Sequence, residues 1–189
     1  MKTRSLIPNI LIVTEGETEK IYLSHLRERN TNYSVHVKSY GGAGAVKILD
    51  YCESTFRMMK LNRGRGDVAI CVLDVDRNTI ENLETAITEA EKKKILLIIS
   101  NPCIEAFFML HFREGIPNLP PAEMKQKLTE YIEDYTETGD YWYLLSDMRM
   151  KAIERTRGFT LCRESLEQGI IGSNIYELFD LIERMKKKN

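Results

Sequence analysis

The stretch VAICVLDVD, residues 68–76, decides the fold of this chain. Its first six residues are all apolar and rich in β-branched side chains, and no polar residue interrupts them. Such a run predicts a strand that is buried on both faces, as in the interior of a parallel sheet. The run ILIV, residues 10–13, has the same character and predicts a second buried strand. Each run leads into acidic residues, with Glu15 after the first and Asp74 and Asp76 after the second.

Strands and helices are expected to alternate through the rest of the first part of the chain. Two more segments have the pattern of strands, residues 33–40 and 95–99. Three segments carry apolar residues at helical spacing, residues 17–29, 46–59 and 103–112. We expect Pro102 to open the last of these helices, and Asn78 to cap a further helix with Glu81 completing a capping box. The alternation predicts an α/β fold with a parallel-rich sheet and helices on both faces.

The pattern changes after Gly115. Pro117, Pro120 and Pro121 mark a break, and no segment beyond them has the pattern of a strand. Helical spacing instead predicts helices over residues 122–134, 147–156 and 174–187. We therefore expect one domain, with a core at residues 1–115 and a helical C-terminal extension at residues 116–189 packed on it.

Composition narrows the class of protein. The 189 residues are 43% hydrophobic and 29% charged, which is typical of a globular protein rather than a disordered one. Lys and Arg number 27 against 28 Asp and Glu, so the chain is not a uniformly basic nucleic-acid coat, although a local basic patch stays open. The four cysteines form no CxxC pair, and we find no signal peptide and no apolar run of about 20 residues that would span a membrane. A cytoplasmic protein with free thiols is expected.

Acidic side chains are expected to converge at one edge of the sheet. Parallel α/β sheets bind ligands beyond the carboxyl ends of their strands, where five acids are placed: Glu15, Glu19, Asp74, Asp76 and Glu105. The first two are four residues apart and share a helix face, and the two aspartates are two apart and share a side of an extended chain. Clustered carboxylates are tolerated around a divalent cation, and all-oxygen ligands favour Mg²⁺ or Mn²⁺.

Structural roles compete with this interpretation. Acids also stabilise helix N-termini through capping and the helix dipole, and each of these acids precedes or begins a predicted helix. Glu105, the only charge between Pro102 and Phe112, is expected either in the site or in a structural salt bridge. His111 lies about 240° around the helix from Glu105, so we interpret it as a core or boundary histidine.

Basic and aromatic segments are candidates for contact with nucleic acid. The stretch with Arg149, Lys151, Arg155 and Arg157 has little acidic opposition and could grip a phosphate backbone. A second basic segment covers residues 57–65. Residues 41–44 are glycine-rich and, with Lys47, could cradle a phosphate, although a plain turn is the alternative. Residues 141–143, Tyr-Trp-Tyr, either stack on bases or pack between helices.

These motifs together resemble a known family. ILIVTEGETE, followed 59 residues after Glu15 by the Asp-x-Asp that begins at Asp74, resembles the Toprim domain of topoisomerases, primases and related nucleases, a small Rossmannoid α/β domain. SNPCIEAFFMLHF, residues 100–112, is similar to the signature of RloB-like proteins, a Toprim branch that includes AbiLii of phage abortive-infection systems. The Toprim likeness covers residues 8 to about 112, and the RloB-like likeness extends more weakly to the C-terminus.

The resemblance implies roles for these residues. It implies that Glu15 is a metal ligand or general acid/base, that Asp74 and Asp76 hold Mg²⁺, and that Glu19 is the second acid of nuclease branches. With Glu105 as a further catalytic candidate, the expectation is a metal-dependent nuclease that hydrolyses RNA or DNA in phage defence. The resemblance also implies an ABC-type ATPase as partner. The alternative is a non-catalytic module that binds a nucleotide or a partner and regulates that ATPase.

Overall fold

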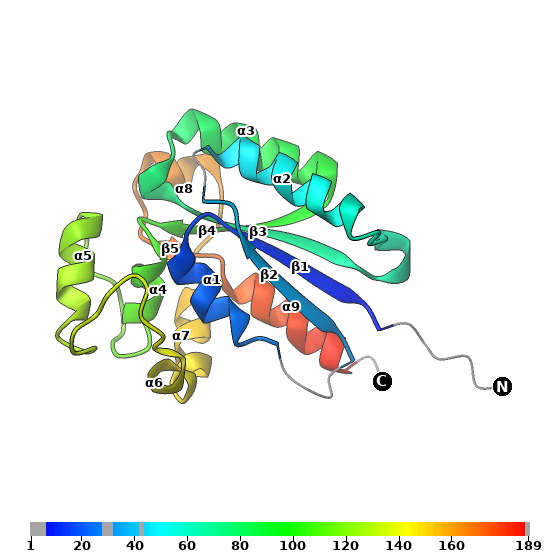
Figure 1. The fold of residues 1–189 in the computed structure, drawn as a ribbon. Coiled ribbons are helices and arrows are strands. Elements are labelled where there is room, and N and C mark those ends of the chain that lie inside the picture. Colours follow the sequence, from blue (N-terminus) through cyan, green and yellow to red (C-terminus); the bar gives the residue numbers. More distant parts are fainter. Residues whose placement is uncertain (1–6, 28–31, 42–43, 188–189) are drawn as a thin grey trace.

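A five-stranded sheet organises the computed structural model, which describes residues 7–27, 32–41 and 44–187 (Figure 1). The strand order is β2-β1-β3-β4-β5, and the first four strands are parallel. Their bounds are β1 Asn9–Thr14, β2 Ser34–Ser39, β3 Val68–Asp74, β4 Ile95–Asn101 and β5 Gly172–Ser173. The predicted α/β fold with a parallel-rich sheet is confirmed.

Helices cover both faces of the sheet because its inner strands are apolar on both sides. Ile10 and Ile12 of β1 point to one face, while Leu11 and Val13 point to the other, and all four are fully buried. The second face is covered by α2 Ala45–Met58, α3 Ile80–Lys93 and α8 Arg163–Glu167. On the first face lie α1 Glu17–Ser24, α4 Ile104–Met109 and α9 Tyr176–Lys187. Three more helices extend the same hydrophobic cluster away from the sheet: α5 Pro121–Leu128, α6 Trp142–Ser146 and α7 Arg149–Thr156.

The connections create a crevice between β1 and β3. The chain passes from β1 outward to β2 on one side, and then returns to β3 on the other side of β1. Such a reversal of strand order opens a crevice at the carboxyl ends of the two strands, which is the usual ligand site of open α/β sheets. The pair is in register from Ile10 opposite Val68 to Thr14 opposite Val72, so the residues after both strands emerge side by side.

The C-terminal part of the chain joins the same sheet. Its two-residue strand β5 pairs antiparallel with β4, and the predicted absence of a strand after Gly115 is therefore wrong. Asn174 fixes this junction, because its side chain accepts a bond of 2.8 Å from Ile99 N and donates one of 2.9 Å to Leu97 O. A two-residue strand leaves no period-2 pattern in the sequence, which is why it escaped prediction.

Several predicted element boundaries also need correction. The predicted helix 122–134 ends at Leu128, and the predicted 147–156 helix is the second of two short helices, α6 and α7. The helix predicted at 17–29 ends at Ser24, and residues 28–29 lie outside the described residues. Pro102 precedes the N-cap Cys103 instead of opening α4. Within the described ranges, no helix is long and apolar enough to cross a membrane.

Candidate acidic site at the carboxyl edge

Glu15 is fixed at the crevice by backbone pairing. Its N–H donates to Val72 O at 3.0 Å, which continues the β1–β3 ladder by one residue beyond Thr14. Its carboxylate turns back toward β3, where it accepts a bond of 3.2 Å from Asp74 N. Glu15 is buried as a result, and burial raises its pKa above the ordinary value although the Asp74 and Asn78 hydrogen bonds oppose the rise.

Asn78 is the residue that ties the site together, and the sequence did not reveal it. Its amide nitrogen donates to both Glu15 carboxylate oxygens at 3.1 and 3.3 Å and to Asp74 O at 2.9 Å. Its amide oxygen accepts a bond of 2.9 Å from Ala45 N at the start of α2. The predicted capping role is wrong, because Thr79 caps α3 through a 3.3 Å bond from Asn82 N. Asn78 and Thr79 are both good capping residues, so the sequence does not show which of them caps α3. In the structure Thr79 is the cap, and the Asn78 side chain bonds to Glu15 instead.

The position after Glu15 requires a glycine, Gly16, because the Glu19 carboxylate approaches it closely. A Cβ at this position would lie 2.7 Å from Glu19 Oε2, which is closer than real Cβ contacts. The missing side chain therefore lets the Glu19 carboxylate fold back against the β1–α1 turn. Burial raises the pKa of Glu19 to about 7, Glu105 and Glu15 add to the rise, and Arg77 opposes it.

Asp74 has a buried carboxylate oxygen whose hydrogen-bonding capacity no described residue satisfies. Its Oδ1 is buried and has no hydrogen-bond partner in the part of the chain that the structure describes, an arrangement that native proteins rarely tolerate without a functional reason. Burial holds its pKa well above the ordinary value, and Glu19 and Glu105 add to this effect. Asp76, in contrast, is exposed and lies in the 3-10 turn η2 Val75–Arg77. The prediction that both aspartates extend from a strand is wrong, since the chain turns directly after Asp74.

The C-terminal part completes the site from the other side. Glu105 lies in the first turn of α4 and is 2% exposed, and its Oε1 accepts a 2.8 Å bond from the hydroxyl of Tyr135. The segment that carries Tyr135 is anchored at Glu137, which pairs with Lys125 and whose carbonyl accepts a 2.9 Å bond from the Thr18 hydroxyl. Of the two roles expected for Glu105, the structural salt bridge is not found among the described residues, where a tyrosine donates to its carboxylate instead.

The donor set fits a hard divalent cation. Glu15, Glu19, Asp74 and Glu105 are each between 2% and 5% exposed, they supply only carboxylate oxygens, and one buried Asp74 oxygen lacks a partner. In the described residues, however, no three Asp, Glu, His or Cys side chains are grouped as closely as the ligands of one metal ion. The side chains would have to turn toward one another on binding. The predicted ligands thus stay a prediction, with a chemistry that fits Mg²⁺ or Mn²⁺.

The predicted nucleic-acid contacts divide into two groups. Lys47 lies at the start of α2 and lines a cavity beside Asp76 and Arg77. The cations on α7 and at its C-cap make contacts elsewhere: Arg149 stacks on Trp142, Arg155 donates to Leu110 O at 2.7 Å, and Arg157 binds Asp180 through two bonds of 2.7 and 2.8 Å. Lys151 is exposed on the same helix. The structure does not bring the α7 residues to the acids.

The other sequence candidates have structural surroundings. Trp142 stacks on His25 with ring centroids 5.0 Å apart, as expected of a packing residue, whereas Tyr143 is exposed. His111 is buried, its Nδ1 faces the Phe107 carbonyl at 3.1 Å, and burial lowers its pKa to about 4, which confirms the core interpretation. Gly42 and Ala43 of the glycine-rich loop lie outside the described residues.

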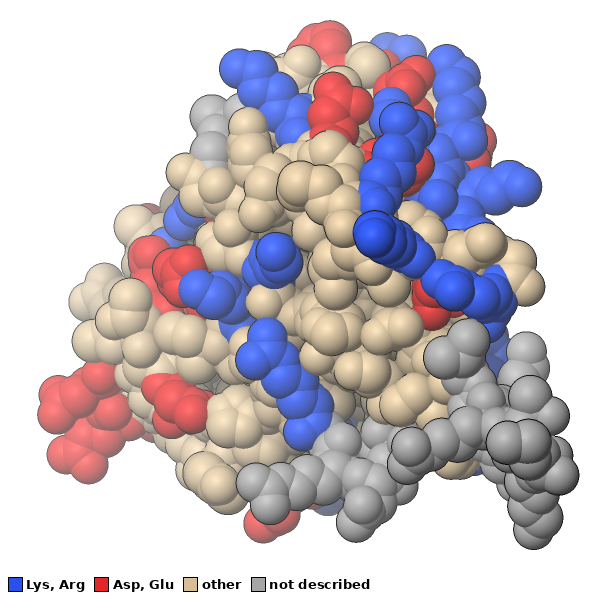
Figure 2. Space-filling model, turned by 45° about the vertical axis from the view of Figure 1, so that its right-hand side comes forward, with Lys and Arg blue, Asp and Glu red and all other residues tan. Residues whose placement is uncertain are grey.

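The second basic segment is partly neutralised. Lys and Arg side chains gather toward the upper right of Figure 2, with Asp and Glu side chains among them. Arg57 and Arg63 both pair with Glu53, at 3.1 and 2.7 Å, and Arg65 lies 3.7 Å from Asp67. Mixed, paired charge of this kind is typical of a solvated surface rather than a phosphate-binding face. All four cysteines are free thiols, as expected.

Comparison with known proteins gives one match. A family model described as RloB-like protein matches residues 10–182, which include the sheet, the acidic edge and most of the C-terminal region. No curated protein and no solved structure matches the chain.

Proposed function

The chain belongs to the RloB-like family, and from this premise we propose that it is a Toprim-type, Mg²⁺- or Mn²⁺-dependent nuclease that hydrolyses phosphodiester bonds in RNA or DNA during phage defence. The proposal rests most on Asp74. Its Oδ1 is buried and has no hydrogen-bond partner among the described residues, and the charges of Glu19, Glu105 and Glu15 lie near it at the crevice between β1 and β3. Natural proteins keep so costly a group where a ligand satisfies it.

The proposed reaction gives these residues different roles. Asp74 and Glu19 would hold the cation, with Asp76 at the solvent side. When bound, the cation would polarise a phosphoryl oxygen and lower the pKa of a water. Asn78 and Asp74 N orient the Glu15 carboxylate through their hydrogen bonds, and Tyr135 orients Glu105.

Proton transfer would fall to the carboxylates. Glu15, whose carboxylate is oriented by Asp74 N and the Asn78 amide, would act as the general base that takes a proton from the water. Glu105, on the other side of the site, is the second candidate for proton transfer. Because Tyr135 fills one Glu105 oxygen, its remaining oxygen is the one available to substrate or water.

A cleavage assay tests this function. Single- and double-stranded DNA and RNA are incubated with the chain in Mg²⁺, in Mn²⁺ and in EDTA. We expect cleavage in a divalent cation only, and a loss of at least about a hundredfold in Glu15→Gln, because mutation of a general base typically costs that much. Glu91→Gln, on the exposed side of α3, is the matched control and should cleave normally. Cleavage in EDTA, or full activity of Glu15→Gln, would refute the proposal.

One observation favours a second function. The acids are not grouped as ligands of one ion within the described residues, and the guanidinium of Arg77 faces them. A non-catalytic module that binds a nucleotide or a partner and regulates an ATPase would not need a bound cation. Calorimetric titration separates the two functions, because such a module would give no heat with Mg²⁺ or Mn²⁺ either alone or with nucleic acid.

We also propose an ABC-type ATPase as the partner. The sequence contains no Walker motif, so a nucleotide-driven switch would have to come from another protein. Copurification with the product of a neighbouring ATPase gene is the expected result. An isolated gene without an ATPase neighbour would count against this partner.

A further inference from the structure

Arg77 is an unpaired cation at the edge of the acidic site. It ends the η2 turn, directly between Asp76 and Asn78, and it is exposed. Its Nη1 lies 3.6 Å from where a Cβ on Gly16 would stand, so the side chain reaches back across the crevice to the β1–α1 turn. Within residues 7–27, 32–41 and 44–187, its guanidinium nevertheless makes no hydrogen bond and no ion pair.

Nearby carboxylates stabilise the positive charge of Arg77. Burial would lower its pKa, but the nearby charges of Glu19, Asp74 and Asp76 raise it above the ordinary value. The acids thus attract the guanidinium without any of them binding its N–H groups. A planar guanidinium with free donors is suited to bidentate contact with a phosphate.

Two cavities meet at Arg77, and their charges differ. The first, here called the Lys47 cavity, has a volume of about 540 Å³ and contains two cations, Lys47 and Arg77, against one carboxylate, Asp76. The second has about 580 Å³, and there Arg77 faces three carboxylates, those of Glu15, Glu17 and Glu137. Of these two cavities, the Lys47 cavity is the one whose charge balance favours an anion.

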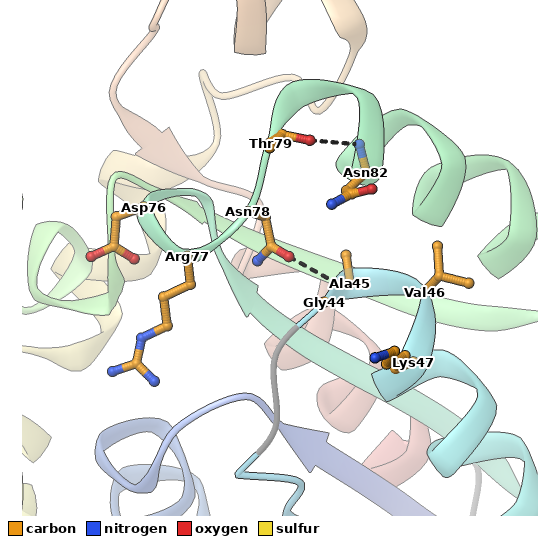
Figure 3. A pocket seen from close by; sticks show the side chains of 9 residues that line it. All are labelled: Gly44, Ala45, Val46, Lys47, Asp76, Arg77, Asn78, Thr79 and Asn82. Carbon is orange, nitrogen blue, oxygen red and sulfur yellow. Dashed lines mark hydrogen bonds between the residues drawn. The ribbon is translucent and has the colours of Figure 1, made fainter.

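The two cations of the Lys47 cavity stand apart rather than together. Figure 3 shows Arg77 and Lys47 on either side of Asn78, whose side chain is fixed between Ala45 N and the Glu15 carboxylate. The Lys47 ammonium, like Arg77, has no ion pair or hydrogen bond in the described part of the chain. Because the two cations stand on either side of Asn78, each can contact a separate phosphate of a polymer.

We propose that the Lys47 cavity binds the phosphate backbone of the nucleic-acid substrate, with Arg77 on the phosphate next to the acids and Lys47 on the neighbouring phosphate. This inference rests on the proposed nuclease function, because it places the first phosphate where the acids would act. Arg77 also offsets the repulsion between that phosphate and the carboxylates. The strand enters over the starts of α2 and α3 and reaches the acids at Arg77, which lines both cavities.

Binding measurements test this inference separately from cleavage. Fluorescence anisotropy of a labelled oligonucleotide, as DNA and as RNA, is recorded at several salt concentrations in EDTA and in Ca²⁺. The variants are Arg77→Gln, Arg77→Lys and Lys47→Gln. Lys94→Gln is the matched control, since Lys94 is an exposed cation at the C-terminal end of α3 that makes no ion pair with any described residue. Melting curves check that every variant is folded.

We expect Arg77→Gln and Lys47→Gln each to weaken binding at least about threefold, and to reduce the slope of log K against log salt by about 0.7, the value for one phosphate of a single strand. Arg77→Lys should recover part of the affinity, and Lys94→Gln should bind like the wild type. Normal binding by Arg77→Gln and Lys47→Gln, or no binding by the wild type in either buffer, overturns the subsite.

The outcomes for the two proposals are distinguishable. If the variants weaken binding as expected but no protein cleaves in Mg²⁺ or Mn²⁺, the subsite stands and the nuclease function falls. If the wild type cleaves and Arg77→Gln both cleaves and binds normally, the nuclease function stands and the subsite falls.

Discussion

Glu19→Gln should stabilise the fold in a pH-dependent manner. The change removes a buried charge and keeps the size of the side chain. Burial raises the pKa of Glu19 from 4.5 to about 7, so the folded state holds this proton more tightly than the unfolded chain. Stability is therefore lost as the pH rises from about 4.5 to about 7, where the folded chain keeps more protons than the unfolded one.

The size of the effect follows from that shift. One pKa unit corresponds to about 1.4 kcal/mol, so the ionised carboxylate costs on the order of 3 kcal/mol above pH 7. Glu19→Gln should recover much of this at pH 8 and almost none near pH 4. For a chain of this size about 1 kcal/mol shifts the melting temperature by about 2–4 °C, so we expect a rise of roughly 6–12 °C at pH 8.

Thermal unfolding in EDTA, over a pH series at constant ionic strength, measures this difference. Glu17→Gln is the matched control on the same helix, because Glu17 is exposed and its pKa is lowered by a hydrogen bond with Lys20. That change should leave stability within about 0.5 kcal/mol or lower it slightly. If the wild type and Glu19→Gln show parallel curves of stability against pH, the reasoning about the buried acid is refuted.

Three further changes test other parts of the site. Gly16→Ala should keep the fold but displace the Glu19 carboxylate, so that the melting temperature no longer rises with Mn²⁺. Asn78→Asp replaces a donor with a charge beside Glu15 and should destabilise the fold by several kcal/mol at pH 8, with much of the loss recovered near pH 4. Tyr135→Phe leaves a buried Glu105 oxygen without its donor and should cost about 1–3 kcal/mol in chemical denaturation.

For each of these three predictions, one result would contradict the reasoning behind it. A normal Mn²⁺ response in Gly16→Ala would mean that Glu19 is no ligand. An Asn78→Asp protein that is equally destabilised at pH 4 and pH 8 would mean that charge repulsion is not the cause. Tyr143→Phe is the control for the tyrosine change, since Tyr143 is 82% exposed, and an equal loss in both variants would remove the special role of Tyr135.

The buried strands were the most predictable part of the fold. The runs 10–13 and 68–73 contain nothing but apolar residues, and only a strand covered on both faces by helices can bury them. Since parallel strands end at a common edge, the placement of Glu15 beside Asp74 followed from the same argument. Both predictions depended on one strong pattern, the continuous apolar run.

The parts that escaped prediction depend on tertiary contacts. The Asn174 side chain holds β5 against β4 through two hydrogen bonds, and the residues of β5 themselves show no sequence preference for a strand. Asn78 and Tyr135 reach the acids only through the turn after β3 and through the segment after α5. The role proposed for Arg77 could not be predicted for a similar reason. A single arginine after Asp-x-Asp is informative only once the structure shows the cavity that it lines and the absence of an ion pair among the described residues.

The most direct test of the acidic site is calorimetric titration of Mn²⁺ into the wild type and Asp74→Asn, with and without a non-cleavable oligonucleotide. The wild type should bind Mn²⁺ and release protons near pH 7, with less release at pH 8.5, because metal displaces the proton that Glu19 holds. Melting curves should show a gain of about 2.7 kcal/mol at a hundredfold excess over the dissociation constant. Asp74→Asn should show neither heat nor stabilisation. Equal Mn²⁺ affinity in both proteins, or no binding by the wild type even with the oligonucleotide, would contradict the metal site.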